Sequence, residues 1–381
     1  MSLIGTPFLA LTFAVAFALT LGTLALWNRM RGPAPLRTGL RLALLLAAQA
    51  AAVLVVLVSI NDNYLLYDSW RDLTDGASTA TTLETAAAAA AGGSADAAPT
   101  GAAGVLGLPP GPGRPDLRSG LHPDFRPAGA GLLGAQLTGA RSGLHGSLYV
   151  WLPPEYDDPA HLGERFPVVE LLPGQPGSPL AWFQVLQGQR TLQRLVSTGQ
   201  ARPMILVSAM SNTLGGSDAG CADLPGGPHT QTWLGADVPA IVRSEFRASA
   251  DPADWSVMGF SAGGYCSADL LVHFPGVFHS AVSLSGYTDP EAPVVLSHPA
   301  LARRENPRLV MLAAFPQPDI DLLMAGSLED GRTVADARAM VAVLRPPAEG
   351  DLLTVDRGGH TVDVWVAMLP DAFRWISRHL H

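Results

Sequence analysis

The pentapeptide Gly259-Phe260-Ser261-Ala262-Gly263 constrains the fold of this chain more than any other feature. It ends an apolar run, Asp254 to Phe260, that is typical of a strand, and a stretch with helical spacing follows it. A G-x-S-x-G at a strand-to-helix turn strains the serine backbone and leaves only glycine-sized space on either side. No other serine of the chain lies in this pattern. We predict that Ser261 is a nucleophile at a strand end, with an ordinary glycine-rich turn as the alternative.

Strand-like and helix-like stretches alternate from about residue 129 onward, which predicts an α/β fold with a mainly parallel sheet flanked by helices. About 250 residues are ample for one core of this kind. Besides the run before Ser261, strands are predicted at 146–152, 166–172, 203–209, 279–285, 307–314, 321–326 and 351–356. Helices are predicted at 235–247, 333–344 and 361–380, and Pro370 should kink or split the last one.

Two long runs without a charged side chain lie near the start of the chain, at residues 7–27 and 42–60. A helix of roughly 20 apolar residues crosses the hydrocarbon core of a membrane. Residues 1–6 contain no Lys or Arg, so we favour a two-helix transmembrane hairpin over a cleaved signal peptide followed by a buried helix. The loop between the runs has no acidic residue and should lie in the cytoplasm, because it holds Arg29, Arg31, Arg37 and Arg41.

The composition changes between the hairpin and the α/β region. Residues 74–128 consist largely of Ala, Gly, Pro, Ser and Thr, without the apolar periodicity that buries a core. We therefore expect a transmembrane hairpin over residues 1–73, a flexible linker over 74–128 and an extracytoplasmic catalytic domain over 129–381. The net charge of −9 argues against a nucleic-acid partner, because phosphate binding needs clustered Lys and Arg.

A serine nucleophile needs a base, and the base needs an acid that fixes its tautomer. In a sheet of this kind the acid and then the histidine follow the serine, each after a later strand. Glu329 and Asp330 follow one predicted strand, and His360 follows the last one in a glycine-flanked loop. The predicted catalytic residues are Ser261, Asp330 and His360, with Glu329 as the alternative acid.

The tetrahedral intermediate of acyl transfer also needs two N–H donors directed at its oxyanion. The backbone amide of Ala262, directly after the nucleophile, should supply one. The loop from Leu172 to Gly177 should supply the other, and Gln175 is its predicted donor because Pro176 has no N–H. A simple Pro-Gly turn is the alternative for this loop.

Four segments resemble the putative-esterase family of α/β-hydrolases, which also contains feruloyl esterases and actinobacterial mycolyltransferases: "GSLYVWLPPEY", "VVELLPG", "GFSAGGYCSADL" and "DRGGHTVDVWVAMLPDAFRWI". The resemblance covers about residues 129–381. It implies an α/β-hydrolase fold, with Ser261, Asp330 and His360 as nucleophile, acid and base. The loop departs from the family at Pro173, where a histidine is common, which bears on the oxyanion hole and not on the triad. The hairpin with "NDNYLLYDSW" looks like membrane-bound members from high-GC Gram-positive bacteria.

The chain contains two cysteines, Cys221 and Cys266, too few for a disulfide scaffold or a thiolate zinc site. One bridge is compatible with an oxidising compartment. The segment "GCADLPGG" around Cys221 also looks like a family segment, and with it we favour a Cys221–Cys266 disulfide beside the helix after Ser261. Two buried thiols are the alternative.

The expected function is acyl transfer through an acyl-enzyme, which makes the protein an esterase if water is the acceptor and an acyltransferase if a hydroxyl is. The membrane tether suggests a small-molecule, lipid or glycan ester of the cell envelope as substrate. A non-catalytic envelope binding protein on a hydrolase scaffold is the alternative, and a transporter or sensor is disfavoured because the spans carry no charge. The chain has no nucleotide-binding loop and no H-E-x-x-H, so we expect neither a cofactor nor a metal.

Overall fold

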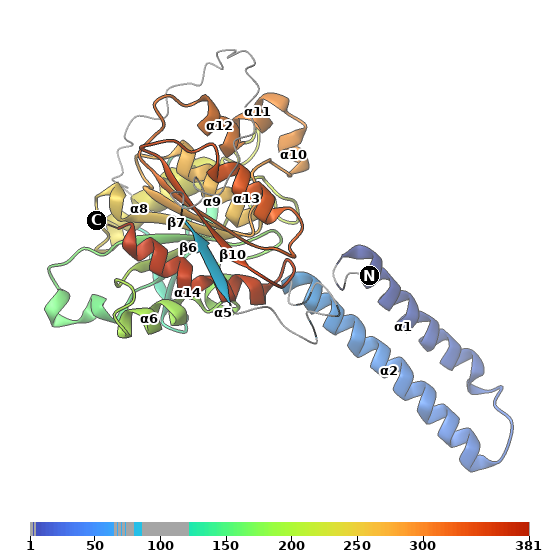
Figure 1. The fold of residues 1–381 in the computed structure, drawn as a ribbon. Coiled ribbons are helices and arrows are strands. Elements are labelled where there is room, and N and C mark those ends of the chain that lie inside the picture. Colours follow the sequence, from blue (N-terminus) through green and yellow to red (C-terminus); the bar gives the residue numbers. More distant parts are fainter. Residues whose placement is uncertain are drawn as a thin grey trace. The chain divides into compact units, whose positions relative to one another are not determined.

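The computed structural model describes residues 3, 5–64, 67, 70, 73, 80–85 and 122–380 (Figure 1). The chain divides into two compact units. The first comprises residues 1–77 with 359–363, and the second comprises 78–358 with 364–381. The first unit is built on a helical hairpin, and the second is a sheet covered by helices.

The hairpin consists of α1 (Thr6–Trp27) and α2 (Ala34–Tyr64). Both helices are long and apolar enough to cross a membrane by length and composition. The two predicted spans, 7–27 and 42–60, lie within them. α2 has 31 residues and is therefore longer than its apolar run.

Side chains of the hairpin are distributed as a lipid environment would favour. The large apolar side chain of Phe17 is exposed, whereas the small polar side chains of Thr12 and Thr23 are buried. Small residues between two helices let the helices approach closely in a membrane. At the loop end of the hairpin, the Arg41 guanidinium donates a hydrogen bond of 2.8 Å to the Trp27 carbonyl and lies over the Trp27 ring. This contact joins the end of α1 to the beginning of α2.

The second unit contains a ten-stranded sheet in the order β1-β10-β9-β8-β7-β5-β6-β4-β3-β2. The strands from β10 to β6 in this order are parallel, and β1, β4, β3 and β2 are antiparallel to their neighbours. Every residue of β5, β6, β7 and β8 is buried, as expected for parallel strands covered on both faces. The strands are β1 (Thr81–Glu84), β2 (Arg126–Gly129), β3 (Leu132–Thr138), β4 (His145–Trp151), β5 (Val168–Leu172), β6 (Ile205–Ala209), β7 (Trp255–Phe260), β8 (Ser280–Leu284), β9 (Asp321–Ser327) and β10 (Glu349–Val355).

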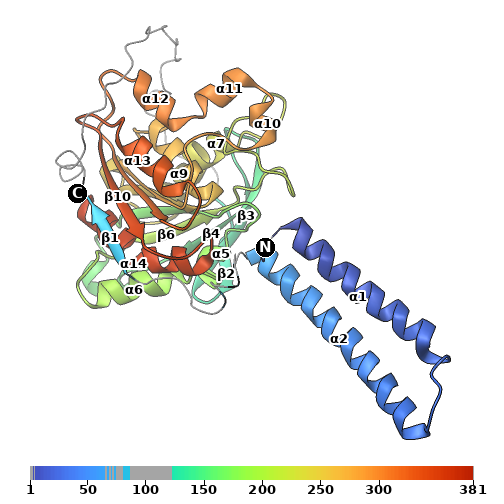
Figure 2. The ribbon, with the colours of Figure 1, turned by 45° about the vertical axis from the view of Figure 1, so that its right-hand side comes forward.

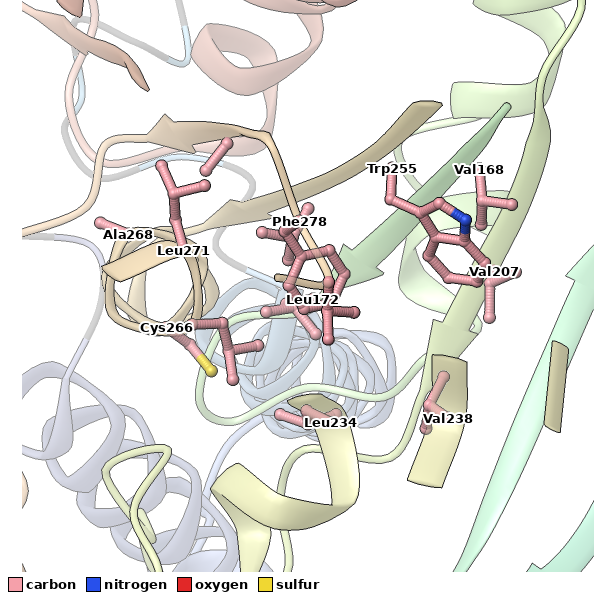
Figure 3. Packing of buried hydrophobic residues seen from close by; sticks show 14 of the residues in the cluster. Val168, Leu172, Val207, Leu234, Val238, Trp255, Cys266, Ala268, Leu271 and Phe278 are labelled. Atoms are coloured by element: carbon pink, nitrogen blue, oxygen red, sulfur yellow. The ribbon is translucent and has the colours of Figure 1, made fainter. Parts of the chain in front are cut away.

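Different helices cover the two faces of the sheet (Figure 2). Val168 and Val257 belong to a core cluster that includes side chains of α8 (Val238–Glu245), α9 (Ala262–His273) and α13 (Thr333–Val341). Figure 3 shows Val168, Val207 and Trp255 from adjacent strands of this cluster, with Leu234 and Val238 from the helical segment over them. Phe260 of β7 instead packs on Trp182 and Trp365 from the helices of the opposite face. The remaining helices are α5 (Ala181–Gln184), α6 (Gly188–Ser197), α7 (Thr230–Thr232), α10 (Pro293–Leu296), α11 (Pro299–Arg304), α12 (Pro307–Ala313) and α14 (Val362–Arg378), and a π-helical turn spans Trp233–Asp237.

Most predicted strands are confirmed, but the strand predicted at 307–314 is wrong. Residues Pro307–Ala313 form the helix α12. Pro307 occupies the first turn, where its missing N–H costs nothing, and the Asn306 side chain caps the helix by accepting from the Leu309 N–H at 2.9 Å. The apolar run is short, so its composition alone did not separate a helix from a strand. Pro370 lies inside α14, which continues as one helix to Arg378.

The structure also differs from the predicted linker at Thr81–Glu84. These residues form β1, which pairs with β10 at the edge of the sheet, with Thr81 opposite Val355. Two threonines suit an extended strand, and the Thr81 hydroxyl also donates to the Asp371 carboxylate of α14. The rest of the predicted linker up to residue 121 lies outside the described residues.

Candidate active site

Ser261 lies at the turn between β7 and α9, with a backbone φ of 55° and ψ of −126°. A non-glycine residue rarely adopts a positive φ, and functional sites are where such strain accumulates. The Ser261 N–H donates to the Leu284 carbonyl of β8 at 2.9 Å, and the Ser261 carbonyl accepts from the Gly264 N–H at 2.8 Å. These hydrogen bonds hold the serine in the strained turn that the sequence predicts.

The glycines around Ser261 are required by close backbone contacts. A Cβ atom on Gly259 would overlap the Gly263 carbonyl, and a Cβ atom on Gly263 would overlap the Leu172 carbonyl. A side chain at either position would push α9 away from β5 and β7. The sequence expectation of glycine-sized space beside the serine is therefore confirmed.

The loop after β5, predicted to complete the oxyanion hole, lies against Ser261. A Cβ atom on Gly174 would be 3.1 Å from the Ser261 Cβ, so the two backbones are in near contact. α9 begins at Ala262, whose N–H belongs to the first turn of the helix and has no acceptor within it. The structure thus brings the Gln175 loop and the Ala262 amide to Ser261, and their role as oxyanion donors stays a prediction.

Asn212, which no sequence motif indicated, holds this loop in place. Its Nδ2 donates to the Gly174 carbonyl at 3.4 Å and also to the Gly177 carbonyl. Asn212 follows β6, a strand adjacent to β5, so its side chain reaches the loop from the next strand end. Its position after a buried strand was the only signal in the sequence, because the contact depends on strand order.

Cys221 and Cys266 are joined by a disulfide with Cα atoms 5.5 Å apart, which confirms the predicted bridge. The bridge ties a loop after β6 to the second turn of α9 and forms one wall of a small hollow of about 20 Å³ that is open to solvent. The other walls come from the loop after β5 and from the start of α9. Polar lining residues of the hollow include Ser211, Asn212 and Asp218.

The predicted acid and base follow strands that run parallel to β7. Because β7, β8, β9 and β10 are parallel, their carboxyl ends share one edge of the sheet. Asp330 lies in the turn after β9 and is 7% exposed, and His360 lies in the loop after β10 and is half-buried. Glu329 Oε2 accepts a hydrogen bond of 3.0 Å from the Gly358 N–H in the loop that leads to His360. The acidic turn therefore anchors that loop, while the pairing of Ser261, Asp330 and His360 stays a prediction.

One group of described side chains has the composition of a metal site, although no metal was expected from the sequence. Asp269, His273 and Glu305 each offer a ligand atom, and these atoms lie within 4.8 Å of one another. Two of these residues lie on α9, the helix that begins beside Ser261.

The sequence profile described as "Putative esterase" matches residues 143–376, more than half of the chain. The chain belongs to the putative-esterase family. Esterases of this family are serine hydrolases, which agrees with the strained serine at the end of β7. The strand order from β10 to β3 and the helices on both faces give the chain an α/β-hydrolase fold.

An uncharacterised protein of Corynebacterium glutamicum is 25% identical over 256 residues. The match covers 60% of this chain and 56% of that relative, so the chain spans little more than half of the relative's length.

Two solved structures show the same fold in known enzymes. An S-formylglutathione hydrolase from Agrobacterium tumefaciens is 15% identical, with a TM-score of 0.55, and the match covers 68% of this chain and 99% of that chain. The fluorophosphonate-binding serine hydrolase F of Staphylococcus aureus is 16% identical, with a TM-score of 0.53 and coverage of 65% and 98%. At these identities the likeness is one of fold.

Proposed function

We propose that this esterase is anchored in the cell membrane and cleaves or transfers acyl groups through Ser261, His360 and Asp330. The strained turn at Ser261 is the observation that carries the proposal. A fold that only binds has no need to hold a serine at a φ of 55°, since such a conformation costs of order 1–3 kcal/mol. This cost disfavours the alternative of a non-catalytic binding protein.

The reaction proceeds in two steps. His360 takes the proton from the Ser261 hydroxyl, and the Ser261 oxygen attacks the ester carbonyl. The N–H groups of Ala262 and Gln175 stabilise the oxyanion, and the alcohol leaves with the proton from His360. Water or an acceptor hydroxyl then attacks the acyl-enzyme, which regenerates Ser261.

Asp330 is our choice of acid over Glu329. Glu329 already accepts a hydrogen bond from the Gly358 N–H and so serves to anchor the loop of His360. Asp330 lies one residue further in the same turn and is buried, as a residue that orients a catalytic histidine should be. Under this assignment, Asp330→Asn removes most of the activity, whereas Glu329→Gln, whose amide oxygen still accepts from Gly358, retains most of it.

The hollow beside Ala262 favours a substrate with hydroxyl groups. Ser211 Oγ is buried there and has no hydrogen-bond partner among the described residues. Asp218 brings a carboxylate, of which Oδ1 accepts from the Gly220 N–H at 2.7 Å. A buried hydroxyl and a carboxylate suit the hydroxyls of a sugar or glycerol better than an alkyl chain. We therefore infer an ester of a glycan or of a polar lipid headgroup.

The hairpin supports a location for the domain. In the proposed arrangement α1 and α2 span the membrane, and their connecting loop with its arginines lies in the cytoplasm. The esterase domain then lies outside, where the Cys221–Cys266 disulfide is stable.

A fluorophosphonate probe tests the mechanism, because it reacts only with an activated serine. Membranes with the wild-type protein should be labelled, Ser261→Ala should not be labelled, and His360→Ala should be labelled about 100-fold or more slowly. A folded wild-type protein that stays unlabelled after detergent extraction contradicts the catalytic proposal.

A further inference from the structure

We propose that Asp269, His273 and Glu305 bind one divalent metal ion of the zinc class on the helix that follows the nucleophile. This site is separate from the proposed esterase mechanism. Two carboxylate oxygens and one imidazole nitrogen are ligands typical of zinc. The Asp269 and Glu305 side chains are fully buried, and the His273 side chain is 17% exposed. Their ligand atoms lie within 4.8 Å of one another.

The histidine is oriented as metal-binding histidines are. Its Nδ1 lies 2.9 Å from the backbone carbonyl of Asp269, one turn earlier in α9. This contact requires the proton on Nδ1 and directs Nε2 towards Glu305 Oε2 at 4.0 Å. Nε2 is buried and has no hydrogen-bond partner in the part of the chain that the structure describes. Ligating histidines commonly donate their other N–H to a carbonyl in this way, which fixes the tautomer.

The carboxylates also keep oxygens for an ion. Asp269 Oδ1 is buried and accepts no hydrogen bond within the described ranges, and it lies 3.4 Å from His273 Nδ1. Arg304 contacts Glu305 Oε1 at 2.5 Å, so that Glu305 Oε2 faces the cluster. The Gln231 amide donates to Asp269 Oδ2 at 2.8 Å and to Glu305 Oε2 at 2.6 Å, and it lies between the two carboxylates. If the Gln231 side-chain amide were rotated by a half turn, its oxygen would face the cluster and could be a fourth ligand.

Either a proton or a metal ion can supply the positive charge that this cluster needs. Two buried carboxylates need compensating positive charge, and Arg304 supplies one unit. The second positive charge comes either from a proton on His273 Nε2 or from a metal ion at the same atom. A metal ion at Nε2 would lie beside Glu305 Oε2, which is 4.0 Å from this nitrogen, whereas Asp269 Oδ1 lies 3.4 Å from Nδ1 of the same ring.

Zinc titration of the full chain in detergent, after treatment with a chelator, tests the proposal. Isothermal titration calorimetry should show one zinc ion per wild-type chain, and zinc should raise the thermal unfolding temperature. His273→Gln and Glu305→Gln should each weaken zinc binding about 100-fold. His161→Gln is the matched control, because His161 also pairs with a carboxylate, Glu164 at 2.9 Å, but on the surface.

Folded wild-type protein without saturable binding, or with the same zinc affinity as both cluster variants, would overturn the proposal. If the variants do not fold, cobalt(II) added to the wild type decides the matter: visible absorption bands of a nitrogen- and oxygen-bound ion support the site, and their absence overturns it. Ser261→Ala should still bind zinc. Failure of the esterase mechanism is thereby distinguished from failure of the metal site.

Discussion

Some single residues of this protein have an unfavourable conformation or environment, and the surrounding fold offsets the free-energy cost. Ser261 keeps a strained backbone because β8 and the first turn of α9 bond to it on both sides. Glu170, in the middle of β5, is a second case: both of its carboxyl oxygens are buried without a hydrogen-bond partner among the described residues. Burial raises the pKa of Glu170 well above its ordinary value of 4.5. The acid is therefore protonated in the folded protein at pH values where the unfolded chain has lost the proton.

Stability should consequently depend on pH through Glu170. The contribution of the protonated acid is complete below an ordinary pKa of 4.5 and declines as the pH rises towards the folded-state pKa. Glu170→Met should remove this decline and stabilise the protein by about 1–3 kcal/mol at pH 8. Thermal unfolding between pH 5 and 8 measures the effect. The exposed acid Glu291, changed to Gln, serves as the control, and an unchanged slope for Glu170→Met contradicts the prediction.

Asn212 should act by positioning the oxyanion loop. Asn212→Asp keeps the shape of the side chain but replaces the Nδ2 donor by an oxygen that repels the carbonyls of Gly174 and Gly177. We expect kcat on a small aryl ester to fall about 10- to 100-fold with little change in KM, because a loop displaced by about 1 Å misplaces the oxyanion donor. The unfolding temperature shows whether the variant is folded. A folded Asn212→Asp protein with the wild-type kcat rules out this role.

At the scale of elements, the junction of β7 and α9 organises the site. The strand places Ser261, the helix supplies the Ala262 amide, and the Cys221–Cys266 bridge ties α9 to the loop that lines the hollow. Phe260 of β7 stacks on Trp365 at 4.5 Å between ring centroids, which supports the turn from the opposite face of the sheet. The junction is thus held by a disulfide on one face and by aromatic packing on the other.

The disulfide should contribute measurably to stability. It closes a loop with a sequence separation of 45 residues. Chain-entropy arguments assign about 4 kcal/mol to a loop of this length. We expect Cys221→Ser with Cys266→Ser to lower the unfolding temperature, and a reductant to lower it for the wild type but not for the variant. Identical unfolding temperatures of variant and oxidised wild type would contradict a structural role.

At the scale of the whole molecule, two units of different chemistry share one chain. The hairpin exposes apolar side chains along both helices, whereas the sheet unit buries its apolar side chains between strands and helices. This division fits a membrane anchor and a water-exposed enzyme. The proposed orientation follows from the arginines of the loop between α1 and α2.

Cysteine labelling can test the orientation, because the described residues contain no free cysteine. Asn28→Cys, in the loop between the helices, should react with a membrane-impermeant maleimide only after the cells are opened. Ala140→Cys, on the exposed part of the sheet unit, should react in intact cells. The reverse pattern would place the esterase domain in the cytoplasm.

The sequence by itself determined the features that depend on neighbouring residues. The strand before Ser261, the glycines on either side of it and the apolar runs of α1 and α2 are local patterns, and the structure contains all of them. The disulfide could be predicted because the sequence contains only two cysteines. The strand prediction failed at residues 307–313 because it used apolar composition alone, although Asn306 and Pro307 are local signals for the start of a helix.

Only the tertiary structure decided what depends on distant partners. Thr81–Glu84 forms a strand because β10 offers a free edge more than 260 residues later in the chain. Asn212 reaches Gly174 because β6 lies next to β5, and Glu305 reaches His273 because α11 ends beside α9. Such contacts arise from strand order and helix packing, which bring together segments whose sequences do not indicate that they are neighbours. For that reason the strained turn at Ser261 could be predicted from the sequence, whereas the distant residues around it could not.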